Sequence, residues 1–264
     1  MRKQFISSFL TVAAGLMGAL PFIAPPAKGQ FPAESTLPKD KRPKRRPDKA
    51  PTGPTPRTAD GKPDLSGVWG YGGITSDIAR DYDVGELPMT PLADKLFKER
   101  QANLGKDDPE ARCLPTGVPR RDPYPTKIIQ EKNLVVILFE GNIHSYRQIF
   151  LDRGHPKDLA PTWYGDSVGH WEGDQLVVDT IGSNGKLWLD MAGHPASDQL
   201  HVIERYSRPD FGHLKLEVTI EDPVMYTRPW KMSYITPMQE GDIIEYICQE
   251  NEKDSYHLVG ASGK

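Results

Sequence analysis

The 264-residue sequence predicts a mainly β protein: an antiparallel meandering β-barrel or strongly curled sheet of about eight to ten strands, with one short covering helix. Three observations predict this class. Short segments of alternating apolar and polar residues follow one another from residue 126 onward. Gly, Asp, Asn and Pro separate these segments, as is typical of turns between strands. Helical spacing is clear in one segment only. Closure into a barrel is favoured because it removes exposed sheet edges.

The strands are expected in order along the chain. The first is Leu65–Trp69, a short apolar run between the turn signal Asp60-Gly61 and a glycine cluster. The cleanest alternation lies in 212–222, where Leu, Val and Ile take one face and Lys, Glu and Thr the other. The strand-bearing segments after the first are 127–141, 143–152, 161–171, 175–182, 199–208, 212–222, 230–238 and 242–251.

The helix is predicted from its two ends. Thr90 supplies an N-cap, Pro91 stands at the first helical position, and Gly105 stands where a C-cap glycine belongs. Apolar residues recur between them at a spacing of three or four but form a narrow stripe. A narrow stripe predicts a surface helix that covers one end of the sheet. The rest of 70–125 is expected to be irregular.

The stretch "GHWEGDQLVVDT", residues 169–180, predicts a hairpin. Gly173-Asp174 is a two-residue turn signal, and the resulting register pairs Trp171 with Leu176. His170 and Asp179 then share a face that is otherwise apolar, so Asp179 must find polar partners or shift its pKa upward. Glu-Gly-Asp recurs at 240–242 and predicts a second hairpin of the same kind.

Residues 1–29 are expected to be a signal peptide, with a positive start, an apolar run and small residues before the cleavage point. Residues 30–56 are expected to be a disordered, basic, proline-rich tether, and 57–264 one β-barrel-like domain. The protein is therefore predicted to be exported, periplasmic or secreted, without a stable membrane span. Of the net charge of −3, the signal carries +3 and the tether +4, which leaves −10 on the domain. An acidic domain argues against nucleic-acid binding.

The two cysteines, Cys113 and Cys248, are expected to form a disulfide, because export places them in an oxidising compartment; two buried free thiols are the alternative. The bond would tie an irregular segment to the last strand.

Gly67-Val68-Trp69 at the start of an antiparallel meander resembles the Gly-x-Trp signature of the calycin superfamily, which includes the lipocalins and fatty-acid-binding proteins. This resemblance implies a barrel that binds a small molecule. The second lipocalin signature, Thr-Asp-Tyr, is absent, and 70–125 is longer than that family's first connection. "PDLSGVW" and "WEGDQLVVDT" also resemble a large group of exported bacterial proteins of unassigned function.

The sequence favours no nucleotide, metal or other cofactor. It has no G-x-S-x-G elbow and no phosphate-binding glycine loop. The seven histidines show no metal-binding spacing, so no metal ligand is predicted. They are His144, His155, His170, His194, His201, His213 and His257.

Acid–base side chains are expected to converge at one end of the sheet, around the loop 182–198. Aromatic rings and one arginine would hold a ring-shaped ligand. The alternative is that the charges form cross-strand ion pairs and the tryptophans belong to the core. The candidate catalytic residues are Asp179, Asp190, His194, His201 and Glu204, and the candidate substrate-binding residues are Trp171, Trp188, Arg205, Tyr226 and Trp230.

These features predict an exported β-barrel protein that binds a small organic molecule and acts as a cofactor-independent acid–base enzyme of the lyase, isomerase or hydrolase type. Two alternatives stay open: a non-catalytic, lipocalin-like carrier and an envelope structural protein.

Overall fold

The computed structural model describes residues 50–70, 75–120, 124–141, 143 and 145–250. The expected signal peptide and most of the expected tether lie outside these residues.

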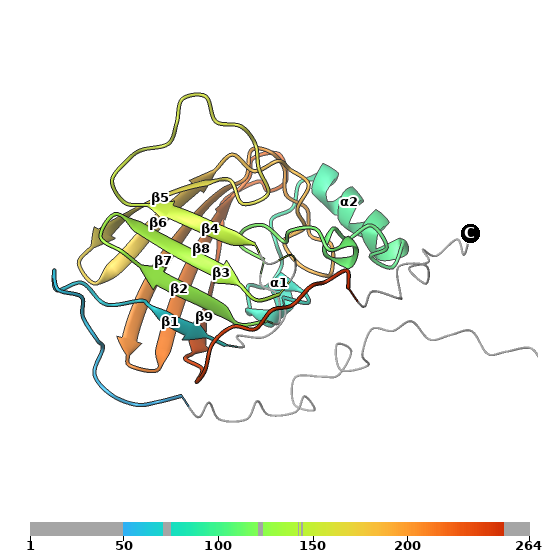
Figure 1. Cartoon of the computed structure of the whole chain (residues 1–264). Helices are drawn as coiled ribbons and strands as arrows, with labels where there is room; N and C mark the ends of the chain where they lie inside the picture. Colours follow the sequence, from blue (N-terminus) through green and yellow to red (C-terminus); the bar gives the residue numbers. More distant parts are fainter. Residues whose placement is uncertain (1–49, 71–74, 121–123, 142, 144, 251–264) are drawn as a thin grey trace, which may run out of the picture. The chain divides into compact units, whose positions relative to one another are not determined.

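Nine strands form one sheet, in which each strand neighbours the next in chain order (Figure 1). The mainly β prediction is confirmed. The strands are β1 (Gly67–Trp69), β2 (Thr126–Gln130), β3 (Leu134–Phe139), β4 (Tyr146–Phe150), β5 (Asp166–Glu172), β6 (Gln175–Ile181), β7 (His201–Asp210), β8 (His213–Glu221) and β9 (Trp230–Pro237).

The sheet is nearly closed into a barrel because its first strand meets the end of its last. Trp69 forms a bridge with Met238, next to β9. Gly70 N donates to Pro237 O at 2.9 Å, and Gln239 N donates to Val68 O at 2.8 Å. The exposed edge of β1 is thereby covered at this point.

One strand pair differs from the expected meander. β4 and β5 run parallel, pairing Ile149 with Ser167 and Phe150 with Val168, whereas all other neighbouring strands in the sheet are antiparallel. Parallel neighbours need a crossover connection of about a dozen residues or more. The irregular segment 151–165 provides it, and Figure 1 shows this segment as the large loop beside β5.

The core fills the barrel interior. Leu214, Leu216, Val218 and Ile220 of β8 are each at most 5% exposed, while the residues between them are partly exposed. This period of two places the apolar face inward, as the sequence predicted. The hairpin at Gly173-Asp174 is likewise confirmed, with its predicted register.

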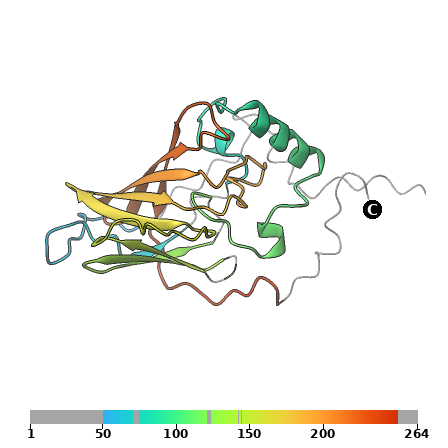
Figure 2. The ribbon, with the colours of Figure 1, turned by 90° about the horizontal axis from the view of Figure 1, so that it is seen from above.

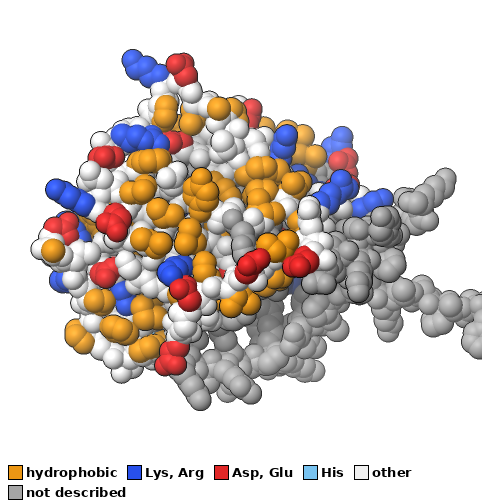
Figure 3. Space-filling model, viewed as in Figure 1, with side chains coloured by type: hydrophobic (Ala, Val, Ile, Leu, Met, Phe, Trp, Pro, Cys, Tyr) orange, Lys and Arg blue, Asp and Glu red, His pale blue; other side chains and the backbone are white. Residues whose placement is uncertain are grey.

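The opposite face of β2, β3 and β4 also carries apolar side chains. Figure 3 shows hydrophobic side chains gathered over these strands. Ile129 of β2 is 37% exposed and Tyr146 of β4 is 60% exposed. Every residue of β3 is apolar. Its outward residues Leu134, Val136 and Leu138 are therefore apolar side chains that are partly exposed.

The helices gather at one end of the barrel (Figure 2). α2 (Pro91–Ala102) begins at the predicted N-cap, where Thr90 Oγ1 accepts a hydrogen bond from Ala93 N at 3.2 Å. The short α1 (Ile78–Asp81) and the 3-10 helix η3 (Glu110–Arg112) were not predicted. No helix within the described ranges has the length and apolar character needed to cross a membrane.

The second predicted hairpin, at Gly241-Asp242, does not form. The segment after Pro237 contains no strand up to residue 250. Asp242 instead pairs with Lys127 of β2 at 2.6 Å, and Ile244 N donates to Glu140 Oε2 at 3.0 Å. These contacts hold the segment extended along the barrel, so the copy of Glu-Gly-Asp is not used as a turn.

The predicted disulfide is present. Cys113 and Cys248 are bonded, with their Cα atoms 5.7 Å apart and 135 positions between them in the sequence. It joins two irregular segments rather than a segment and a strand, because no strand forms at Cys248.

The end of the predicted tether contacts the barrel. Phe211 N donates to Gly53 O at 2.9 Å, and Thr55 Oγ1 donates to Arg208 O at 2.8 Å. Residues 50–56 therefore lie against the turn between β7 and β8.

Candidate functional site

A buried polar group lies inside the barrel, where most inward side chains are apolar. Arg147 of β4 reaches across the interior and pairs with Glu204 of β7, at 2.5 Å between Nη2 and Oε2. Both side chains are 4% exposed. Since taking two charges out of water costs several kcal/mol per ion, such a pair persists only where further hydrogen bonds satisfy it.

Three hydroxyl groups supply those bonds. Arg147 donates to Ser167 Oγ at 3.0 Å and to Thr180 Oγ1 at 2.7 Å. Tyr206 Oη donates to Glu204 Oε1 at 2.9 Å. Alternation explains this assembly, because each of these residues occupies an inward position of its strand.

Burial and charge fix the ionisation of the group. Burial alone would lower the pKa of the Arg147 guanidinium, but the adjacent Glu204 charge raises it well above its ordinary value. Burial and the Glu204 charge raise the pKa of Tyr206, so this phenol stays protonated and acts as a donor.

A cavity of about 90 Å³ adjoins this group. A single water needs about 10–15 Å³ of such space, so the cavity has room for a small molecule. Arg147, Glu204 and Tyr206 form its polar wall, and the segment 116–120 borders it. The apolar wall comprises Trp69, Ile128, Ile137, Phe139, Leu214 and Leu216.

Arg120 lines the cavity as a buried, paired charge. Its side chain is 1% exposed, its two Nη atoms bond Asp108 at 2.8 and 2.9 Å, and Nη2 also donates to Glu110. Burial would lower the pKa of Arg120, but the hydrogen bond and charge of Asp108 raise it. Its Nε, like Trp230 Nε1, is buried without an acceptor among the described residues.

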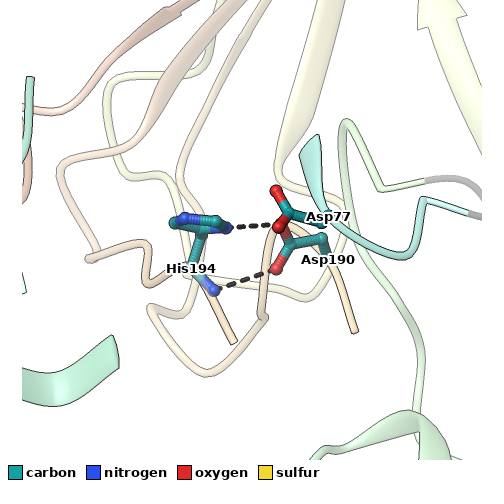
Figure 4. A group of neighbouring side chains, drawn as sticks. All are labelled: Asp77, Asp190 and His194. Atoms are coloured by element: carbon teal, nitrogen blue, oxygen red, sulfur yellow. Dashed lines mark hydrogen bonds and ion pairs between the residues drawn. The ribbon is translucent and has the colours of Figure 1, made fainter. Parts of the chain in front are cut away.

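Asp190 and His194 form a second group, at the helical end of the barrel. His194 Nδ1 lies 2.5 Å from Asp190 Oδ2, and Asp190 is fully buried (Figure 4). Asp190 also accepts from the backbone N–H groups of Ile78, Gly193 and His194. Its carboxylate thus joins the turn at 190–194 to the start of α1.

Asp77 approaches this pair, and the three residues could in principle hold a metal because their ligand atoms lie within 4.8 Å of one another. However, Asp77 Oδ1 accepts from Ala79 N and Arg80 N as the N-cap of α1. The two carboxylate oxygens of Asp190 already accept four hydrogen bonds. Structural anchoring therefore accounts for this group without an ion.

Asp179 and His201 form a third group, on the outer face of the barrel. His201 Nε2 lies 3.0 Å from Asp179 Oδ2, and His155 Nε2 lies 3.1 Å from Oδ1. Asp179 therefore has polar partners, as its position in the sequence predicted. The five candidate catalytic residues thus fall into three hydrogen-bonded groups, and among the described residues no hydrogen bond or ion pair joins Asp179 and His201 to Asp190, His194 or Glu204.

The predicted substrate-binding residues do not line the cavity. Arg205 is outward and pairs with Glu172 at 2.6 Å, while Trp171 is partly buried with Lys62 5.9 Å over its ring. Trp188, Tyr226 and Trp230 belong to the core, with Tyr226 edge-on to Trp230 at 5.4 Å. Of the ten predicted site residues, Glu204 is the one that lines the cavity.

The sequence analysis missed Arg147, although a signal was available. In "YRQIF", Arg147 shares a strand face with the apolar Ile149, so the alternation predicts that Arg147 points inward. Arg120 had no such signal, because it lies in an irregular segment.

Comparisons with known proteins add no relationship: a scan against family models and searches of curated proteins and solved structures found no match to the chain. The fold and site thus define this protein only as a nearly closed β-barrel whose cavity has an apolar wall and a buried polar group.

Proposed function

We propose that this is an exported, calycin-like carrier whose barrel binds one small organic molecule with an apolar ring and an oxygen acceptor. The observation that carries the proposal is the cavity itself, with a polar wall formed by Arg147, Glu204 and Tyr206 opposite an apolar wall. An acceptor oxygen would face the polar wall, and the apolar part would pack against residues such as Trp69 and Leu216.

The cavity supports binding rather than acid–base catalysis. Four of the five candidate catalytic residues lie outside its lining, and the fifth, Glu204, is held by Arg147 and Tyr206. The net charge near the cavity favours a neutral ligand. Arg147 is balanced by Glu204, and Arg120 is outnumbered by Asp108 and Glu110.

Binding is tested with three probes of one ring size: benzyl alcohol, benzoate and toluene. Trp69 lines the cavity, so bound probe should change tryptophan fluorescence and raise the melting temperature. We expect benzyl alcohol to bind most tightly, because it offers both a ring and a neutral acceptor.

Two variants locate the site. Leu216→Trp should fill the cavity and abolish the response, whereas Ile235→Trp, at a position 47% exposed, should leave it unchanged. Arg120→Lys keeps the charge but removes the guanidinium from the cavity wall, so benzyl alcohol should lose about tenfold in affinity while toluene loses nothing. The proposal fails if no probe binds the wild type, or if Leu216→Trp, shown to be folded, binds as well as wild type.

Export is supported by the features of residues 1–29. On expression in a Gram-negative host, the periplasmic protein should begin at Gln30 when its intact mass is measured. A cytoplasmic protein that retains residue 1 would contradict export while leaving the binding proposal standing.

A further inference from the structure

Five side chains on the outer face of the barrel form a chain in which carboxylates and imidazoles alternate. Asp166 of β5 contacts His155 Nδ1 at 2.7 Å, and His155 Nε2 contacts Asp179 of β6 at 3.1 Å. From the other side, His201 Nε2 of β7 contacts Asp179 at 3.0 Å, and its Nδ1 contacts Glu221 of β8 at 3.0 Å.

The two imidazoles of this row must supply N–H donors for four contacts with carboxylates. A neutral imidazole has one N–H donor and one acceptor nitrogen, and an ionised carboxylate has acceptors only. In both His155 and His201, each ring nitrogen faces a carboxylate. With neutral rings, two of the four contacts would therefore bring acceptor against acceptor. Either protonation of both rings or a metal cation beside Asp179 removes this conflict, and the test below separates the two.

The outer carboxylates support that arrangement. If His155 donates Nδ1–H to Asp166 and His201 donates Nδ1–H to Glu221, both Nε2 lone pairs point toward Asp179. Histidines that bind metals almost always donate their other N–H to a carboxylate or carbonyl, which fixes the tautomer and the ring orientation. Both imidazoles have such a partner here. Arg153 in turn pairs with Asp166 at 2.6 Å and holds that carboxylate in place.

We propose that His155 Nε2, His201 Nε2 and an oxygen of Asp179 bind a divalent transition metal of the Zn²⁺ type. Two imidazoles and one carboxylate are a ligand set that zinc accepts, with water in a remaining position. The side chains are 20%, 29% and 42% exposed, so water can reach the ion.

The distances fit two edges of such a site. Ligand atoms about 2.0–2.1 Å from zinc lie about 3.3 Å apart in a tetrahedron, close to both contacts with Asp179. The two imidazoles contact different oxygens and so flank the carboxylate. In this structure the ligand atoms of the three residues do not all lie within 4.8 Å of one another. His155 must therefore move toward His201 on binding, which its place in the irregular segment 151–165 permits.

The test is a Zn²⁺ titration of the mature chain by calorimetry, repeated with Co²⁺, whose visible absorption reports coordination. We expect one ion per chain. His155→Gln and His201→Gln should each lower the affinity at least about 100-fold, and Asp166→Asn about 10–100-fold. His170→Gln is the matched control: His170 lies on the outer face of β5, and its one ion-pair partner among the described residues is Glu172, so binding should not change.

Two further measurements keep the result decisive. Thermal melts establish that each variant is folded, and hydrogen exchange should show slower exchange in 151–165 when zinc is added. Absence of a stoichiometric ion in the wild type overturns the proposal, as does wild-type affinity in His155→Gln. Loss of the ion in His194→Gln alone would place it at the Asp190 group and overturn the proposal as well.

Discussion

At the scale of single residues, the barrel interior depends on Arg147, whose charge is buried and whose one carboxylate partner among the described residues is Glu204. Buried ion pairs contribute little net stability compared with apolar residues of the same volume, but losing one partner leaves an uncompensated charge. The pair therefore constrains which substitutions the interior accepts.

We accordingly predict that Glu204→Gln lowers the free energy of unfolding by about 3–5 kcal/mol, since the isosteric amide cannot balance Arg147. Urea denaturation followed by circular dichroism measures the change. Arg205→Gln, the next residue along β7, breaks an exposed pair with Glu172 and should change stability by less than about 1 kcal/mol. Equal effects in the two variants would contradict the role of the buried pair.

The hairpin residue Asp174 makes a second, pH-dependent contact. Its carboxylate accepts two hydrogen bonds from Arg57, at 2.9 and 2.7 Å. The hydrogen bond from Arg57 lowers the pKa of Asp174. A carboxyl group with a lowered pKa in the folded state stabilises above its ordinary value, near pH 4, and that contribution is lost as the pH falls through the folded value.

We therefore predict that the segment around Arg57 becomes more susceptible to proteolysis in the wild type as the pH falls below about 4. An acid-stable protease such as pepsin provides the measurement. Asp174→Asn should be cut at a rate that depends on pH only through the protease itself. The same acid response in wild type and variant would show that other carboxyl groups govern this segment.

At the scale of elements, the position where α2 begins is fixed by the hydrogen bonds of its first turn. Thr90 Oγ1 accepts from Ala93 N and donates to Val224 O at 2.9 Å, so one hydroxyl both caps the helix and joins it to the segment after β8. Its N-cap and proline are local signals, which is why its start could be predicted; the helix ends at Ala102 with Asn103 as C-cap, before the predicted C-cap Gly105.

We predict that Thr90→Ala destabilises the protein by about 1–2 kcal/mol, because the cap and its second hydrogen bond are both lost. A thermal melt measures this as a lower melting temperature. Thr90→Ser retains the hydroxyl and should restore most of the loss. If the serine variant is as unstable as the alanine variant, packing of the methyl group matters more than the cap.

The two Glu-Gly-Asp sequences show the limit of local signals. At 172–174 the turn forms because both flanking strands pair and the glycine adopts φ +61°. At 240–242 the glycine also has positive φ, +95°, yet no strand follows. The ion pair of Asp242 with Lys127 and the disulfide at Cys248 hold this segment on a different path.

At the scale of the whole molecule, the disulfide joins the segment that borders the cavity to the segment after β9. It closes a loop between positions 135 apart in sequence. Long loops give the unfolded chain the most entropy to lose, so a bond of this span is expected to stabilise strongly.

We predict that Cys113→Ala with Cys248→Ala lowers the free energy of unfolding by about 4–5 kcal/mol in the chain-entropy model. Urea denaturation of the oxidised protein and of the double variant measures the difference. A reducing agent should destabilise the wild type similarly and leave the variant unaffected. An unchanged unfolding midpoint in the variant would contradict the prediction.

The sequence by itself determined most of the strands, their inward faces, the helix N-cap and the hairpin at 173–174, but the strand expected at 242–251 does not form. Each correct element depends on neighbours within a few positions, through the period of two and through local turn and cap chemistry. The sequence also identified Asp179 as an unusual charge within an alternating strand and Glu204 as a candidate catalytic residue.

The tertiary structure alone decided where those charges act. Arg147 and Glu204 meet because β4 to β7 curl around one interior, and His155 reaches Asp179 because the crossover that makes β4 and β5 parallel carries it there. These contacts join positions 24 to 57 apart in sequence. Local alternation says which face a side chain takes, but only barrel closure and the path of the loops say which side chains it meets.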